Sequence, residues 1–171
     1  MNKFSLVKRI SILCFSLLFA LSGYAQKKME SPRDSCSGKI GKATISMNYG
    51  SPSVKGRKIW GDLIPYGKVW RAGANEATTF KTDQNITVEG KALPAGTYGF
   101  FVIPGETTWT IIFNKTFKQW GAFKYDPKED ALRVDVKPAK SKSLTERLVY
   151  KINADGISLS WENIVVPVSI K

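Results

Sequence analysis

The chain has 171 residues, with 26 basic and 14 acidic side chains and no histidine. The missing histidine excludes a Ser-His-Asp triad, an imidazole general base and a zinc site of the usual Cys/His type. The length suits a single domain with a substantial hydrophobic core.

The first 25 residues have the pattern of a secretory signal peptide. A basic segment, residues 3–9, precedes the apolar run ISILCFSLLFAL at 10–21, which is short of the roughly 20 apolar residues that span a bilayer. Gly23-Tyr24-Ala25 then supplies the small residues of a cleavage site. We therefore expect an exported protein, periplasmic or extracellular, that loses this segment. The alternative is an uncleaved anchor.

Residues 26–38 (QKKMESPRDSCSG) are polar and contain a proline and a glycine. This composition predicts a flexible leader, followed by a single domain at 39–171. Cys36 is the only cysteine after residue 25, so it cannot form an intrachain disulfide. Because histidine is missing, we exclude Cys-His catalysis and interpret Cys36 as an unremarkable residue of the leader.

The charge distribution argues against a nucleic-acid partner. Three basic residues fall within the first 25, so the remainder carries a net charge of +9. The lysines are mostly isolated between apolar residues, and there is no block of five like charges. This spacing is typical of a solvated face. A weaker alternative is attraction to anionic surfaces such as acidic glycans or lipid head groups.

Short strands account for most of the remaining sequence. Ile45, Met47 and Tyr49 alternate with polar residues, a period of two that predicts a half-buried strand. Residues 56–67 contain three glycines and a proline and predict a loop. We find no helix of useful length and expect an all-β fold, an antiparallel β-sandwich or flattened barrel of about nine short strands. The expected strands are 44–49, 77–82, 86–88 with 92–93, 97–103, 108–114, 131–136, 144–152, 157–161 and 164–170.

One segment is more polar and more aromatic than a strand requires. Residues 56–80 (GRKIWGDLIPYGKVWRAGANEATTF) combine planar donors, an amide, a carboxylate and tryptophan rings. Such a mixture fits a small polar ligand or a glycan, held by a few polar groups over an apolar floor. The candidate ligand-binding residues are Trp60, Trp70, Arg71, Asn75, Glu76 and Thr78.

The same residues have a structural interpretation. Arg71 and Glu76 could pair with each other, Asn75 could cap a turn, and the two tryptophans could belong to the core. A buried, mutually paired Arg71–Glu76 would favour this alternative, whereas a solvent-reachable pair at a pocket would favour a site.

Two long blocks resemble a known family. They are WGDLIPYGKVWRAGANEATTF at 60–80 and LPAGTYGFFVIPGETTWTIIFN at 93–114, joined by a late LSWE sequence at 159–162. Together they closely resemble the uncharacterised secreted bacterial family called domain of unknown function 2911, over about residues 39–171. The resemblance implies an exported β-rich domain and brings no assigned activity.

Other aromatic residues divide into two groups. Trp109 and Trp161 alternate with aliphatic residues in predicted strands, so we expect both in the core. The loop at 117–125 contains four aromatics, Phe117, Trp120, Phe123 and Tyr125. It predicts either a flap packed over one end of the sandwich, which we favour, or an exposed patch for a ligand or partner.

Three functions remain open, of which we favour the first. The first is a non-catalytic module that binds a small polar ligand or glycan. The second is a structural or partner-binding envelope module, in which residues 70–78 brace the fold. The third is a hydrolase using Glu76 with Asp62 or Asp83, since two carboxylates suffice for glycosidase chemistry. The acidic run at 126–130 lacks calcium-loop spacing and predicts a solvated turn. We expect no metal, no cofactor and no membrane-spanning segment after residue 25.

Overall fold

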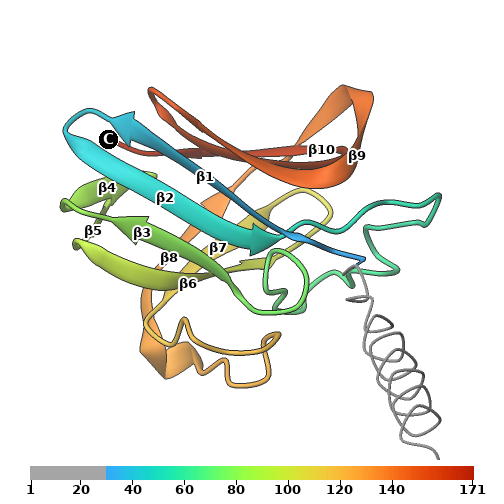
Figure 1. The fold of residues 1–171 in the computed structure, drawn as a ribbon, viewed down its shortest axis with the longest axis horizontal. Coiled ribbons are helices and arrows are strands. Elements are labelled where there is room, and N and C mark those ends of the chain that lie inside the picture. The colour runs from blue at the N-terminus through green and yellow to red at the C-terminus, as the bar shows by residue number, and fades with distance from the viewer. Residues whose placement is uncertain (1–29) are drawn as a thin grey trace, which may run out of the picture.

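The computed structural model describes residues 30–171 and has an all-β architecture (Figure 1). Its strands form antiparallel sheets, and its one helical element in this range is a 3-10 turn at Pro127–Glu129. The predicted β-sandwich is therefore confirmed. No helix between residues 30 and 171 has the length and hydrophobicity to cross a bilayer. The expected signal peptide lies outside the described residues.

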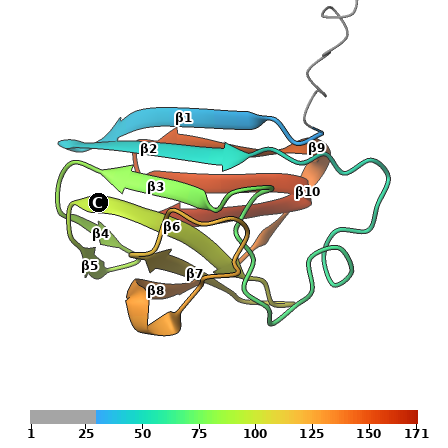
Figure 2. The ribbon, with the colours of Figure 1, turned by 60° about the horizontal axis from the view of Figure 1, so that its bottom comes forward.

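The largest layer is a six-stranded sheet with the order β1-β2-β3-β6-β7-β8. A long hairpin, β9-β10, lies across one face of this sheet, and a short hairpin, β4-β5, lies at one end (Figures 1 and 2). The sheets are open, so the fold is a sandwich and not a barrel. The strands are β1 (Arg33–Ile40), β2 (Ala43–Gly50), β3 (Thr78–Thr82), β4 (Ile86–Val88), β5 (Lys91–Leu93), β6 (Gly96–Ile103), β7 (Trp109–Asn114), β8 (Asp130–Val136), β9 (Ala139–Asn153) and β10 (Gly156–Ser169).

The core lies between the large sheet and the long hairpin. Ile45, Met47 and Tyr49 of β2 are buried as their alternation predicts. The Tyr49 ring meets Tyr150 of β9 edge to face, with ring centroids 4.7 Å apart. This contact joins the two layers, because the two residues belong to different sheets.

Four tryptophans form a second part of the core. Trp60 lies at their centre, with its ring centroid 4.6 Å from that of Trp109 and 5.7 Å from those of Trp70 and Trp161. All four are buried. The prediction that Trp109 and Trp161 belong to the core is therefore confirmed. Edge-to-face and stacked aromatic pairs of this kind stabilise a core beyond the area that they bury.

Three expectations about strand boundaries were wrong. The strand expected at 144–152 is β9, which already begins at Ala139. β1 begins at Arg33, inside the segment predicted as a flexible leader, because its backbone pairs with β2 from Arg33 to Ile40 although most of its side chains are exposed. Residues 157–170, expected as two strands, are mostly one strand, β10, whose register shifts around Glu162. Glu162 has a φ of 55°, which fits a bulge that bends one strand without ending it.

The aromatic loop before β8 is also different from the favoured expectation. Trp120 is 58% exposed and Phe123 is 86% exposed, so neither side chain covers the sandwich. Tyr125, by contrast, is partly buried and packs against Phe101, with ring centroids 5.2 Å apart. The loop is therefore an exposed patch at its tip and packed at its base.

Candidate functional site

The segment from Trp70 to Thr78 crosses the end of the sandwich and is tied to several strands. The backbone of Trp70 exchanges two hydrogen bonds with Val102 of β6, at 2.8 and 2.9 Å. Ala74 donates to the carbonyl of Gly50 at the end of β2, and Ala77 donates to the carbonyl of Gln119. These bonds fix the backbone on both sides of Arg71.

A buried carbonyl lies at the centre of this segment. Ala72 has a φ of 53°, and its carbonyl oxygen accepts from the Thr78 hydroxyl at 2.9 Å and from the Tyr150 hydroxyl at 2.7 Å. Burial raises the pKa of Tyr150 well above its usual value, so this hydroxyl stays protonated and donates. The indole Nε1 of Trp70 donates to the carbonyl of Gly73 at 3.1 Å. This part of the segment braces the fold.

Close backbone packing explains the glycine at the end of β2. A Cβ atom at Gly50 would lie 2.1 Å from the carbonyl oxygen of Ala74, a distance that no real contact allows. A Cβ atom at Gly73 would lie 2.8 Å from the Thr78 hydroxyl oxygen. The turn that presents Arg71 therefore depends on two glycines that let backbones approach closely.

The side chains of Asn75 and Glu76 contact Ser31 and Arg33, at the start of the described chain. The Asn75 side chain donates to the carbonyl of Ser31 at 3.0 Å. The Glu76 carboxylate pairs with Arg33 at 3.3 Å, and its side chain is 51% exposed. Among the described residues, Glu76 makes no ion pair with Arg71, so the pairing that would favour a purely structural segment is not found.

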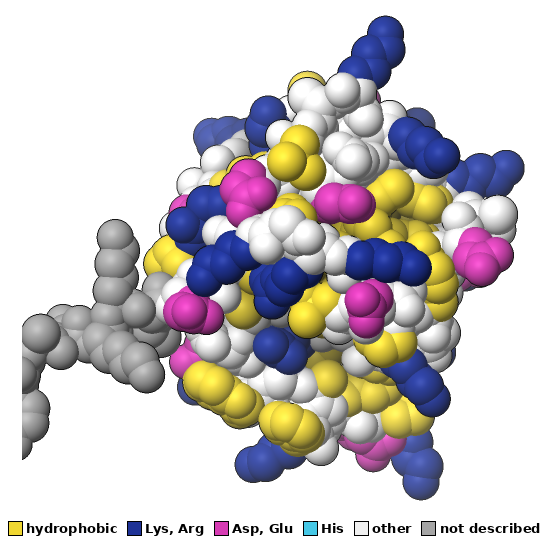
Figure 3. Space-filling model, turned by 90° about the vertical axis from the view of Figure 1, so that its right-hand side faces the viewer, with side chains coloured by type: hydrophobic (Ala, Val, Ile, Leu, Met, Phe, Trp, Pro, Cys, Tyr) yellow, Lys and Arg dark blue, Asp and Glu magenta, His cyan; other side chains and the backbone are white. Residues whose placement is uncertain are grey.

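Arg71 lies at a cavity of about 260 Å³, which we call the Arg71 pocket. A second cavity of about 150 Å³ adjoins it and shares Trp70 and Arg71, with Lys68 in its wall. Figure 3 faces this end of the molecule and shows basic side chains gathered near the centre, beside patches of hydrophobic ones. The side chains that matter most in the wall of the Arg71 pocket are Lys55, Arg57, Trp70, Arg71, Trp161 and Glu30.

The pocket is positively charged. Of its lining residues, Lys55, Arg57 and Arg71 are basic and Glu30 is the one acid. Glu30 is compensated by Lys55, whose Nζ lies 3.4 Å from its carboxylate. Arg57 is held by its own loop, because its guanidinium donates to the carbonyls of residues 53 and 54. An anion in the cavity would therefore meet an excess of positive charge.

Arg71 brings to the pocket a buried donor without an acceptor. Its Nε is buried and has no hydrogen-bond partner. Burial lowers the pKa of Arg71, since the surrounding protein replaces water around the charged guanidinium. Guanidinium groups remain protonated even so, because their usual pKa is far above neutrality. The side chain is thus a partly desolvated cation without a carboxylate among residues 30–171.

The indole Nε1 of Trp161 is a second buried donor without an acceptor, and Trp161 lines the same pocket. Trp60 has an unpaired Nε1 as well, but it does not line the pocket. Buried donors usually have partners, and those of Arg71 and Trp161 belong to residues that line the cavity. The pocket therefore combines cationic donors with an apolar wall of two tryptophans, Trp70 and Trp161.

The six ligand-binding candidates from the sequence lie in different environments in the structure. Trp70 and Arg71 line the pocket, whereas Trp60 and Thr78 belong to the core and Asn75 and Glu76 lie outside the cavity. Sequence reasoning missed Lys55, Arg57 and Trp161. Arg57 lies inside the polar and aromatic segment 56–80 and Lys55 directly before it, so the sequence held a signal for both. Trp161 lies far along the chain in β10, and the sequence pattern alone did not indicate that it would reach this pocket.

A family model described as "Protein of unknown function (DUF2911)" matches residues 31–170. The match spans both blocks noted in the sequence and the late strand that contributes Trp161. The chain matches no curated protein and no solved structure. With nearly the whole described region covered, the chain belongs to the DUF2911 family of proteins of unknown function.

Proposed function

We propose that this protein is an exported, non-catalytic binding module for a small polar ligand that carries a carboxylate or phosphate group. The ligand would occupy the Arg71 pocket. The observation that carries this proposal is the partly desolvated guanidinium of Arg71, with an unpaired Nε, at the wall of a basic cavity.

The partial desolvation and the unpaired Nε of Arg71 are informative because both are energetically unfavourable. Removing a cation from water without a partner is unfavourable, and stability alone would favour an apolar side chain at this position. Proteins keep such groups where function needs them. The planar fork of arginine matches the two oxygens of a carboxylate or phosphate, so a bound anion would supply the missing acceptor.

Size and wall chemistry narrow the ligand class. A cavity of about 260 Å³ is smaller than a pocket for a drug-sized molecule, so it suits a monosaccharide or a short organic acid. Trp70 and Trp161, which stack on each other, form the apolar part of the wall that the C–H groups of such a ligand would meet. An acidic sugar, free or at the end of a glycan, has both features.

The structural alternative applies to other residues of the same segment. Trp60, Asn75 and Thr78 make contacts within the protein, which supports a bracing role for them. The hydrolase alternative needs a cleft around Glu76, and Glu76 does not line the Arg71 pocket. We therefore assign hydrolysis by Glu76 no part in the proposed function. Export rests on the signal-peptide pattern of residues 1–25.

The test is a calorimetric titration with matched acidic and neutral probes. Glucuronate, glucose 6-phosphate and succinate carry the anionic group, and glucose is the neutral control. We expect saturable binding of at least one anion and none of glucose. Arg71→Gln should weaken that binding at least tenfold, because a hydrogen bond to a charged group contributes about 1.5–3 kcal/mol. Lys58→Gln, at an exposed lysine outside the pocket, should leave it unchanged.

Two results would contradict the proposal. One is glucose binding as tightly as glucuronate, which would show that charge does not decide recognition. The other is equal anion affinity in wild type and Arg71→Gln, which would place any binding elsewhere. A panel in which no anion binds would also count against it.

A further inference from the structure

We propose that the loop at residues 115–125, the aromatic loop, docks the protein onto an anionic lipid surface. Trp120 and Phe123 at its tip are 58% and 86% exposed. The other four tryptophans of the chain are buried, so Trp120 is exceptional. Large aromatic side chains that face water in an ordered loop indicate a surface that another phase or molecule covers.

The loop holds these side chains outward because its backbone is fixed. Gln119 accepts from the backbone of Ala77, and Gly121 donates to the carbonyl of Asn75, both at 2.9 Å. The Gln119 side chain is buried, donates to the carbonyl of Thr116 and accepts from the backbone of Lys124. The tip is thus anchored on both sides of Trp120, and the rings cannot reach the core without breaking these bonds.

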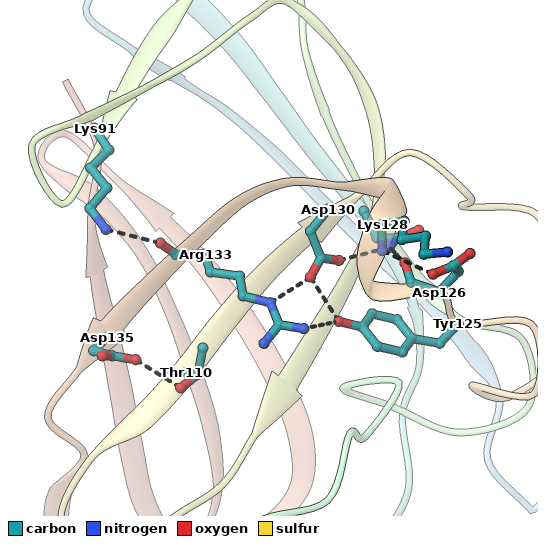
Figure 4. Close-up of polar contacts among 9 residues, drawn as sticks. Lys91, Thr110, Tyr125, Asp126, Lys128, Asp130, Arg133 and Asp135 are labelled. Atoms are coloured by element: carbon teal, nitrogen blue, oxygen red, sulfur yellow. Dashed lines mark hydrogen bonds and ion pairs between the residues drawn. The ribbon is translucent and has the colours of Figure 1, made fainter.

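A polar network fixes the base of the loop (Figure 4). The Tyr125 hydroxyl donates to the Asp130 carboxylate at 2.8 Å, and the Arg133 guanidinium donates to both groups. Asn114 donates to the same carboxylate at 2.8 Å. Asp130 is therefore compensated within the protein and adds little negative charge to the surface that a membrane would approach.

The charge of the loop suits an anionic bilayer. Lys115, Lys118 and Lys124 are exposed, and no acidic residue lies between 115 and 125. The exposed Asp126 and Glu129 follow the loop directly, with the exposed Lys128 between them. Basic side chains bind anionic head groups, and tryptophan prefers the boundary between head groups and hydrocarbon. Trp120 and Phe123 line neither the Arg71 pocket nor its neighbour. A protruding aromatic tip suits insertion into a bilayer, whereas a sugar would be expected in a cavity.

Lipid vesicles provide the direct test. The exported form of the protein would be mixed with vesicles of phosphatidylcholine alone, or of phosphatidylcholine with phosphatidylglycerol, and separated by sedimentation. We expect binding to the anionic vesicles only, weakening as salt rises. Tryptophan emission should shift to shorter wavelength on binding, because Trp120 is the exposed indole.

Matched variants distinguish docking by the aromatic loop from non-specific adsorption through any exposed hydrophobic side chain. The double variant Trp120→Ser/Phe123→Ser should lose vesicle binding and the emission shift. Leu144→Ser removes a comparably exposed hydrophobic side chain, 57% exposed on β9, and should bind as wild type. Both variants should unfold at the wild-type temperature, since the replaced side chains lie outside the core.

Two lysine variants test the electrostatic contribution to vesicle binding. Lys118→Ala should weaken binding to the anionic vesicles about fivefold, the usual contribution of one lysine near such a surface. Lys151→Ala, at an exposed lysine of β9, should have no effect. The proposal is overturned if neutral and anionic vesicles bind equally, or if the loop variants bind like their controls. Binding to soluble acidic polysaccharide without binding to anionic vesicles would also overturn it.

Discussion

The carbonyl of Ala72 offers a test of how residues 70–78 brace the fold. It accepts two hydrogen bonds from buried hydroxyls, those of Thr78 and Tyr150. Either Thr78→Val or Tyr150→Phe leaves the carbonyl one donor, so each should lower the free energy of unfolding by about 1 kcal/mol. The double variant leaves a buried carbonyl without a donor, which adds about 1–3 kcal/mol. The two changes should therefore be non-additive by that amount.

Urea unfolding of the four proteins measures this coupling, provided that the dependence on urea concentration stays the same. Thr79→Val supplies the matched control, because Thr79 is the next residue of β3 and has no bond to Ala72. Its effect should add to that of Tyr150→Phe. A coupling below about 0.5 kcal/mol between Thr78 and Tyr150 would refute the shared-acceptor reasoning.

Three further predictions concern other parts of the sandwich. Glu76→Ala should lower the free energy of unfolding by less than about 1 kcal/mol, because its pair with Arg33 is exposed; a larger loss in thermal unfolding would contradict this. Gly50→Ala should be destabilised by about 3 kcal/mol in urea unfolding, since its Cβ atom would meet the carbonyl of Ala74, and a near-wild-type stability would show that the contact relaxes easily. Burial raises the pKa of the Cys36 thiol from 9.0 to about 11, so the folded state favours the neutral thiol. The neutral thiol therefore contributes fully to the free energy of unfolding below pH 9, and this contribution is lost as pH rises toward 11. Over that range wild type should lose stability relative to Cys36→Ser. Equal pH dependence of the free energy of unfolding in the two proteins would contradict the shift.

Much of the fold follows from local pattern. The alternation at Ile45, Met47 and Tyr49 predicts β2 because one face of that strand is buried. The start of β1 could not be predicted in this way. Its residues from Arg33 to Lys39 are mostly exposed, and pairing with β2 defines the strand in place of hydrophobic burial.

The candidate site was predictable only in part. The unusual composition of residues 56–80 identified Trp70 and Arg71, because the segment is more polar and more aromatic than a strand requires, and loops often carry binding residues. Composition could not distinguish a donor that faces a cavity from one that is used inside the fold. That distinction depends on β10, which brings Trp161 to the pocket from far along the chain.

The central claim is that Arg71 serves a ligand and not the stability of the fold. The most direct measurement is the free energy of unfolding of Arg71→Met, with and without a saturating anion such as glucuronate. Without the anion, we predict a stability within about 1 kcal/mol of wild type, or higher, because the change removes a desolvated cation that has no partner. With the anion, wild type should gain stability and the variant should not. A loss of about 3 kcal/mol or more in the absence of ligand, or an equal gain in both proteins, would contradict the account.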